Sequence, residues 1–170
     1  VYQPKSWAHV VAPTNRRPFG FDWEDWGRLD AIEVLELTRE KLNTDLRRTW
    51  LTGHSLGGHG AWHLGVLYPD RFAAVAPSAG WISMSTYAGA RGLESDHPLA
   101  ALLGRATAPS DTLTLAPNLA GLGVYVLHGD VDDNVPVAQA RRMREALGRF
   151  HPHFVYEERP GAGLWGGNEC

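Results

Sequence analysis

Ser55 is the residue with the clearest capacity for chemistry in this chain. It stands in the run GHSLG at 53–57, with one glycine two positions before it and another two positions after it. A short β-like run at 47–52 precedes the serine, and a helix-compatible run at 59–68 follows it. Gly-x-Ser-x-Gly between a strand and a helix is typical of a nucleophile elbow, a strained turn that presents a serine hydroxyl above the sheet edge. We expect both glycines to be needed because side chains there would clash; the alternative is a glycine-rich turn without chemistry.

An acid is expected downstream of such a serine. A serine hydroxyl is a weak nucleophile until a base accepts its proton, and an acid behind that base fixes its tautomer. In chains with this elbow the order is serine, then Asp or Glu, then histidine. The run HGDVDDNVP at 128–136 follows a predicted strand and offers Asp130, Asp132 and Asp133. The same aspartates could instead form a solvated loop that caps the next helix.

The runs GHSLGG and HGDVDDNVP together resemble the prolyl oligopeptidase-like and esterase branches of the α/β-hydrolase superfamily, including a predicted-peptidase group. The segments WAHVVAPTNRRPFGFDWEDWGRLDA, YPDRFAAVAPSAGW and the C-terminal PGAG and WGGNEC extend the resemblance over nearly the whole chain. The family pattern around the acid is His-Gly, two residues, Asp, two residues, Val-Pro, which selects Asp132. The resemblance implies an α/β fold with a mostly parallel sheet flanked by helices, and hydrolysis of a small ester or peptide substrate.

The resemblance also implies a catalytic histidine after the last strand, in a stretch like Gly-Ala-Gly-His-Trp-Trp-Gly-Asn-Glu. This chain has Leu164 at the histidine position and Gly166 at the second tryptophan. Leucine cannot accept a proton, so the implied triad has no base. The implied oxyanion hole uses the backbone N–H of Leu56 and a second amide from a loop before Val1. Two hypotheses follow: a serine hydrolase impaired at position 164, or a binding or scaffold domain without catalysis.

No other histidine is an obvious substitute for the base. We expect each of them to pack in the core or lie at the surface, and His97 is the least implausible replacement because the segment around it often roofs the pocket. The eight are His9, His54, His59, His63, His97, His128, His151 and His153. The aspartate run lacks the spacing of a calcium-binding EF-hand loop, and no phosphate-binding P-loop is present. The sequence therefore predicts neither a metal site nor a cofactor.

Alternating strands and helices must position these residues. Helices are expected over 26–42, with positions 29, 32, 35 and 42 buried, and over 58–67 and 136–150. Shorter helices are expected over 98–103 and 110–115, the second capped by Ser110. Strands are expected over 7–13, 47–52, 72–77, 124–128 and 153–158. This alternation predicts a parallel sheet covered on both faces.

Composition limits the classes of partner. The chain has 170 residues and a net charge of −3, which gives no reason to expect nucleic acid or an anionic membrane as partner. There is no signal-peptide pattern, and the lone Cys170 leaves the compartment undetermined. The sequence does not determine the oligomeric state either. We expect one domain over 1–170, part of a larger hydrolase fold without its N-terminal strands. Residues 88–121 would be an irregular cap that roofs the pocket with 19–26.

Overall fold

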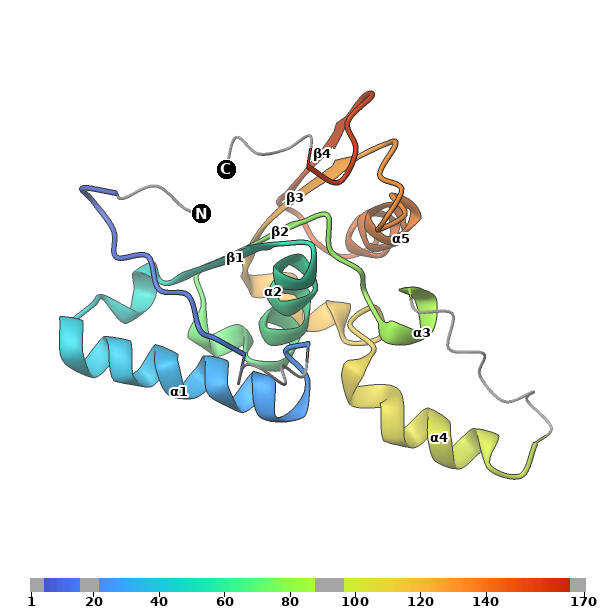
Figure 1. The fold of residues 1–170 in the computed structure, drawn as a ribbon, viewed down its shortest axis with the longest axis horizontal. Helices are drawn as coiled ribbons and strands as arrows, with labels where there is room; N and C mark the ends of the chain where they lie inside the picture. Colours follow the sequence, from blue (N-terminus) through green and yellow to red (C-terminus); the bar gives the residue numbers. More distant parts are fainter. Residues whose placement is uncertain (1–4, 16–21, 88–96, 166–170) are drawn as a thin grey trace.

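The centre of the molecule is a parallel sheet. The computed structural model describes residues 5–15, 22–87 and 97–165. Four strands lie side by side in chain order, and each pairs in parallel with the next (Figure 1). They are β1 (Trp50–His54), β2 (Ala74–Ser78), β3 (Gly123–Gly129) and β4 (Phe154–Arg159). The predictions of a parallel sheet and of these strands are confirmed, with shifted bounds.

The register brings the ends of all four strands to one edge of the sheet. His54 at the end of β1 pairs with Ser78 at the end of β2, and Ser78 pairs with Leu127 in β3. Gly129 at the end of β3 pairs with Arg159 at the end of β4. The segments that follow β1, β3 and β4 therefore meet at this carboxyl edge.

Helices and 3-10 turns connect the strands. The α-helices are α1 (Asp25–Leu42), α2 (Leu56–Leu67), α3 (Met84–Tyr87), α4 (Ala100–Thr107) and α5 (Ala138–Leu147). The 3-10 turns are η1 (Leu46–Arg48), η2 (Pro69–Arg71), η3 (Ala108–Ser110) and η4 (Ala116–Gly121). The three longer helices were predicted, and α4 replaces the shorter helix expected at 98–103. The helix expected over 110–115 is wrong, because Ser110 ends η3 and its hydroxyl donates to Glu24 rather than capping a helix.

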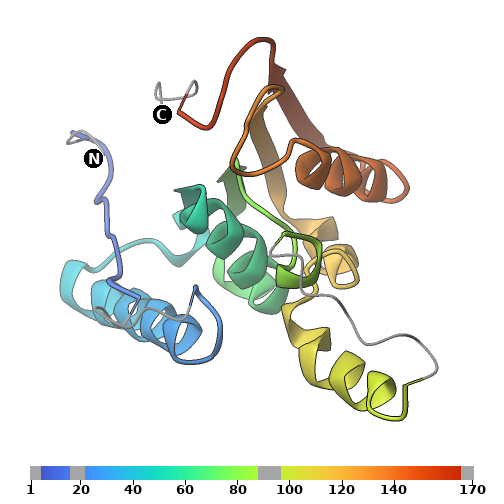
Figure 2. The same cartoon turned by 45° about the vertical axis from the view of Figure 1, so that its right-hand side comes forward.

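The core lies on one face of the sheet. Helices α2 and α5 contribute Trp62 and Met143, which pack with Val75 and Val126 from the strands. Alternate strand residues point to the opposite face, where Trp50, Tyr125 and Val155 are 49%, 37% and 55% exposed. Figure 2 shows α2 and α5 on the same side of the sheet. Among the described residues, the expected cover on both faces is therefore not found.

The predicted N-terminal strand over 7–13 is wrong. The described part of this run is irregular, and Trp7 and Val10 are 70% and 51% exposed. Within this run, Trp7 packs edge-on against Trp50 of β1, with ring centroids 6.0 Å apart. An apolar run becomes a strand only where another strand pairs with it. No strand in the described ranges does so.

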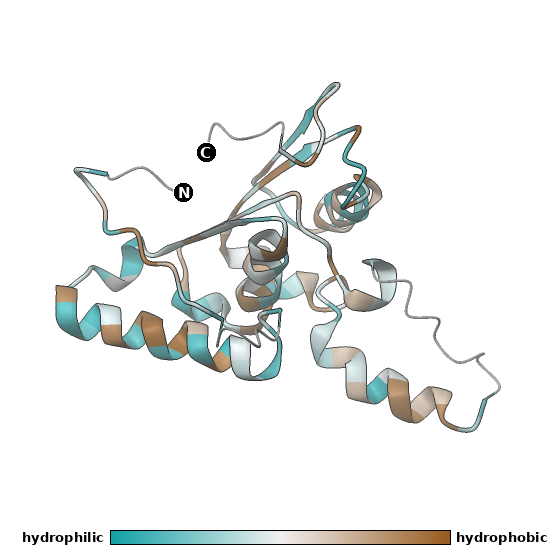
Figure 3. Ribbon diagram, in the orientation of Figure 1, coloured by the Kyte–Doolittle hydropathy of each residue, from teal (hydrophilic) through white to brown (hydrophobic). Residues whose placement is uncertain are grey.

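Helix α1 buries less than its pattern predicted. Leu29 and Leu42 were expected on the buried side but are 45% and 43% exposed, whereas Gly27, Asp30 and Ala31 are buried. Figure 3 shows hydrophobic residues recurring along α1. No helix in the described ranges is both long and apolar enough to cross a membrane.

The expected cap is described only in part. Residues 88–96 lie outside the described residues, as do 19–21 of the second roof segment. Helix α4 extends away from the sheet in both ribbon views (Figures 1 and 2), and Leu102 and Leu103 on it are exposed. That 88–121 roofs a pocket within a single domain stays a prediction.

Candidate active site

Ser55 occupies a strained turn between β1 and α2. Its backbone has φ 54° and ψ −115°, a conformation that is rare for any residue with a side chain. The Ser55 N–H donates to the carbonyl of Ser78 at 2.9 Å, and the Ser55 carbonyl accepts from the His59 N–H at 3.0 Å. These bonds to β2 and α2 hold a geometry that costs about 1–3 kcal/mol. The strand–turn–helix context expected of a nucleophile elbow is present.

Close backbone approaches explain two of the three glycines around the serine. A Cβ at Gly53 would lie 2.2 Å from the carbonyl oxygen of Gly57, so no larger residue fits there. A Cβ at Gly58 would lie 2.3 Å from the carbonyl oxygen of Ser78, so this glycine lets α2 approach β2. A Cβ at Gly57 would meet nothing within 4 Å. The expectation that Gly57 avoids a clash is therefore wrong, and Gly58 has that role.

Leu56 is the first residue of α2. Amides in the first turn of a helix have no acceptor within the helix, and the helix dipole favours negative charge beside them. The Leu56 N–H therefore lies in the first turn of α2, next to the serine. This is the position at which the sequence analysis expected one oxyanion donor. The described residues begin at Lys5, so the second donor, expected before Val1, lies outside them.

Asp132 lies in the loop after β3, at the same carboxyl edge, with an exposed fraction of 8%. Its Oδ1 accepts from the N–H groups of Asn134 and Val135 at 2.9 and 2.8 Å. Its Oδ2 is buried and has no hydrogen bond to any described residue, although His128 Nε2 lies 3.4 Å away. That imidazole nitrogen instead lies 2.8 Å from the Val135 carbonyl. One oxygen of Asp132 therefore fixes the loop, and the other is left for a donor.

The other two aspartates of this loop differ from Asp132. Asp130 Oδ1 accepts from the Gly161 N–H at 2.6 Å, which ties the acid loop to the segment after β4. Asp133 is exposed. A Cβ at Gly129 would lie 2.1 Å from the carbonyl oxygen of Ala162, so the same segment packs directly on the end of β3.

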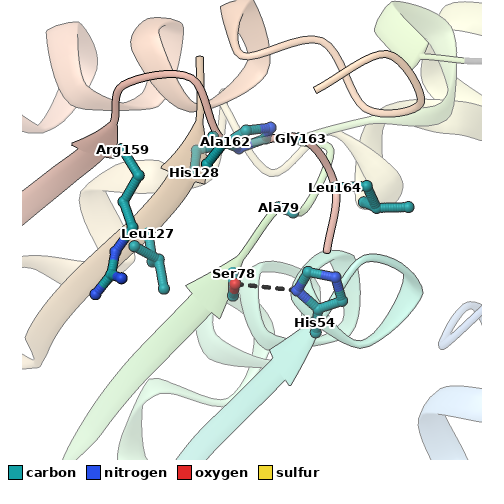
Figure 4. A pocket seen from close by; sticks show the side chains of 10 residues that line it. His54, Ser78, Ala79, Leu127, His128, Arg159, Ala162, Gly163 and Leu164 are labelled. Carbon is teal, nitrogen blue, oxygen red and sulfur yellow. Dashed lines mark hydrogen bonds between the residues drawn. The ribbon is translucent and has the colours of Figure 1, made fainter. Parts of the chain in front are cut away.

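Leu164 lies on this last segment. Together with Ala162, Gly163, His54 and Ser78 it lines a small cavity at the carboxyl edge (Figure 4). Position 164 thus lies beside the strand that leads into the serine turn, although 110 residues separate Leu164 from His54 in the sequence. The side chain at this position is aliphatic and supplies no proton acceptor.

The His54 side chain is held beside the serine rather than presented to it. Its Nδ1 lies 3.1 Å from Ser78 Oγ, and its ring packs on Trp165 with centroids 5.0 Å apart. Burial lowers the pKa of His54, an effect that the Asp132 carboxylate opposes. His97 is exposed, and its Nδ1 accepts from the Leu99 N–H at 3.1 Å.

A second polar group lies on the flank of α2, where the sequence analysis expected only packing. His59 and His63 are buried, and both face the carboxylate of Glu24. Burial lowers the pKa of His63 to about 4, and burial raises the pKa of the neighbouring Asp22 to about 6. The run His-x-x-x-His on a predicted helix was the signal for this pair. Its acidic partner lies 35 residues away and has no such local signal.

Comparison with known proteins identifies the family. The family model described as "Putative esterase" matches residues 4–156. An uncharacterized secreted protein of Arthroderma benhamiae is 33% identical over 168 residues, which cover 93% of this chain and 18% of that protein. The chain therefore spans about a fifth of that relative's length.

Solved structures share the fold. A thermostable esterase is 21% identical with a TM-score of 0.61, over 81% of this chain and 29% of that protein. A puromycin-hydrolyzing peptidase of Mycobacterium tuberculosis is 21% identical with a TM-score of 0.66, over 85% of this chain and 22% of that protein. The parallel sheet, the serine turn after β1 and these matches agree. The chain belongs to this esterase family, within the α/β-hydrolase superfamily.

Proposed function

We propose that this chain carries the nucleophile and the acid of a serine hydrolase that acts on small esters or amides. The observation that carries the proposal is the joint placement of the Ser55 turn and the buried Asp132 at one edge of the sheet. The unpartnered Oδ2 of Asp132 supports it, because a buried carboxylate oxygen without a donor is costly. An imidazole N–H is the donor that such an acid receives in a Ser-His-Asp triad.

The proposed reaction begins with attack of Ser55 Oγ on the substrate carbonyl carbon. In a relative or variant with histidine at position 164, the hydroxyl proton passes to that imidazole, and the Leu56 N–H donates to the oxyanion that forms. The carbonyl re-forms as the bond to the leaving group breaks, and the leaving group takes the proton. Water, deprotonated by the same imidazole, then cleaves the acyl-serine ester and regenerates Ser55.

With Leu164 in place, the first proton has no acceptor at this position. Removal of one triad member costs about 10⁴ to 10⁶ in turnover, while binding and the oxyanion donors retain about 10³ over water. We therefore infer that this chain hydrolyses esters slowly. Leu164 also favours a second function, in which the cleft binds an ester or peptide without turning it over.

The test is to restore the base. Leu164→His should raise hydrolysis of short-chain p-nitrophenyl esters by about 10³-fold or more over the parent. Leu164→Asn is the matched control, because its side chain is polar but accepts no proton at neutral pH. Ser55→Ala combined with Leu164→His should return to the parent rate. A folded Leu164→His variant no faster than the parent would show that position 164 does not serve Ser55.

Fluorophosphonate labelling separates slow catalysis from binding alone. If the parent reacts at Ser55 and the Ser55→Ala variant does not, the serine is still activated. If only the Leu164→His variant reacts, the parent is a binding protein built on a hydrolase site.

A further inference from the structure

A group of three metal-ligand residues lies on the side of α2 away from the serine turn. Glu24 comes directly before α1, while His59 and His63 lie one turn apart on α2. One donor atom from each lies within 4.8 Å of the other two. Glu24 Oε1 is 3.2 Å from His59 Nε2, and Glu24 Oε2 is 3.6 Å from His63 Nε2. Donors about 2.1 Å from a tetrahedral zinc ion lie about 3.4 Å from one another, and the two carboxylate oxygens of Glu24 lie close to this distance from one imidazole each.

Hydrogen bonding fixes which nitrogen of His59 is free. Its Nδ1 lies 3.1 Å from the carbonyl oxygen of Trp81. A carbonyl oxygen only accepts, so Nδ1 must carry a proton, and Nε2 of the neutral ring presents a lone pair to Glu24. A lone pair and a carboxylate oxygen at this distance require a positive charge between them. That charge is either a proton, carried by His59 or by Glu24, or a metal ion.

Neither nitrogen of His63 makes a hydrogen bond to a residue that the structure describes. Its Nε2 is too far from Glu24 for a hydrogen bond, and its Nδ1 is buried without a partner among the described residues. The side chain is 2% exposed, so water does not reach it freely. A buried imidazole without hydrogen bonds is unusual, and a metal ion at Nε2 would explain its orientation.

Asp22 adds an independent observation. Its Oδ1 is buried and has no hydrogen-bond partner in the described part of the chain. The carboxyl group is close enough to interact electrostatically with both His59 and Glu24. A buried carboxylate oxygen without a donor is expected to find a cation. Asp22 therefore adds negative charge near the cluster, while the ligand atoms that lie within 4.8 Å of one another belong to Glu24, His59 and His63.

The surroundings hold these donors in place. A Cβ at Gly60 would lie 2.5 Å from the Trp23 ring, so this glycine lets the loop that carries Asp22 and Glu24 lie on α2. The Ser110 hydroxyl donates to Glu24 Oε2. The Trp81 ring stacks on His59 with centroids 5.0 Å apart and an interplanar angle of 9°. Partners of this kind orient the ligands in metal sites. Arg28 opposes cation binding, because its positive charge is close enough to His63 to interact with it electrostatically.

We propose that Glu24, His59 and His63 bind one divalent zinc-like cation, with the Asp22 carboxylate adding negative charge nearby. Imidazole and carboxylate ligands suit zinc in tetrahedral sites. The site ties the loop before α1 to the middle of α2 and, through Ser110, to η3. Its role is structural, because its ligands do not include the serine, the acid or position 164 of the hydrolase site.

The test measures zinc directly. The whole chain, without a histidine tag and with Cys170→Ser to remove a competing thiol, is stripped with a chelator and dialysed against Zn²⁺. We expect one zinc per chain and a higher thermal unfolding midpoint with zinc than without it. His63→Gln should weaken zinc binding by at least about 100-fold. His153→Gln, which removes an exposed histidine elsewhere, should leave it unchanged.

Two results would overturn the proposal. One is a parent chain that retains no zinc above the His63→Gln level. The other is zinc binding of unchanged affinity in His63→Gln, which would place the ion elsewhere. In either case Glu24 and His59 form a buried ion pair. Glu24→Gln serves the same comparison if circular dichroism shows that His63→Gln does not fold.

Discussion

Helix α2 serves two polar sites that are incomplete in opposite ways. Near its N-terminus, Asp132, the proposed acid, has a buried oxygen without a donor among the described residues, and Leu164 stands where the resemblance implies an imidazole. On its flank, two buried imidazoles face the carboxylate of Glu24. The first site lacks a hydrogen-bond donor, whereas the second brings several groups with electron pairs close together around one carboxylate. A buried atom without a partner therefore indicates the chemistry of the group that would complete its site.

The two sites also differ in what holds them together. The serine turn depends on backbone approaches at Gly53 and Gly58, and residue 164 is not among the atoms that these glycines approach. The flank site depends on side chains from three separate segments, around Glu24, His59 and Ser110. A single substitution should therefore disable the chemistry of the first site without unfolding it, but should change both binding and stability at the second.

The largest expected effect concerns the acid. In the Leu164→His background, Asp132→Asn should lower ester turnover by about 10⁴-fold, because an amide leaves the imidazole in the wrong tautomer. Asp133→Asn, at the exposed neighbour, should change turnover by less than a factor of ten. Steady-state kinetics of both variants measures the two losses of turnover. Equal losses would mean that Asp132 has no special role.

The second largest expected effect concerns the backbone of the serine turn. Gly58→Ala should lower the free energy of unfolding by about 3 kcal/mol or more, since its Cβ would overlap the Ser78 carbonyl. Gly57→Ala is the matched control and should raise that free energy by about 0.5–1 kcal/mol, because its Cβ enters open space in a helix. Urea denaturation measures both. A stable Gly58→Ala variant would contradict the close contact between α2 and β2.

The flank site should respond to pH when it is metal-free. Burial raises the pKa of Asp22 from 3.8 to about 6 in the folded chain, so the folded state holds this proton more tightly than the unfolded state. The contribution of Asp22 to stability is therefore lost as the pH rises from about 4 to 6. Asp22→Asn should stabilise the metal-free chain by about 1 kcal/mol above pH 6, a value discounted for partial solvent exposure. The gain should vanish near pH 4.

His63 should show the opposite sign. Its pKa is lowered to about 4 by burial, so the unfolded state binds the proton more readily. Stability should fall as the pH drops from 6.5 toward 4, and His63→Gln should remove that part of the pH dependence. Thermal unfolding of chelator-treated protein across this pH range tests both residues. Profiles of the variants that run parallel to the parent would contradict the burial of these groups.

The smallest effect concerns Arg28. Its positive charge near His63 should repel a bound cation, so Arg28→Gln should tighten zinc binding by up to about five-fold. Arg141→Gln, which removes a surface charge paired with Glu158, should leave zinc affinity unchanged. Calorimetric titration with Zn²⁺ compares the two. Weaker binding in Arg28→Gln would indicate that the guanidinium supports the site instead.

The order of strands and helices, the serine turn and the loop that carries Asp132 were all predictable from the amino-acid sequence. Periodicity, glycine spacing and turn residues act over a few neighbouring positions, so they are visible without a structure. The resemblance to the hydrolase family, and not a local pattern, is what places the expected base at position 164. Gly57 and Gly58 could not be told apart, because only the packing of α2 on β2 decides which of them lacks room.

Only the tertiary structure decided which surfaces are covered and which distant side chains meet. The apolar run at 7–13 has the composition of a strand but no partner strand among the described residues, so it stays irregular and exposed. Glu24 meets His59 and His63 because Trp23 lies on Gly60, a contact between segments far apart in the chain. Burial and pairing of this kind depend on long-range packing, and no local pattern records it.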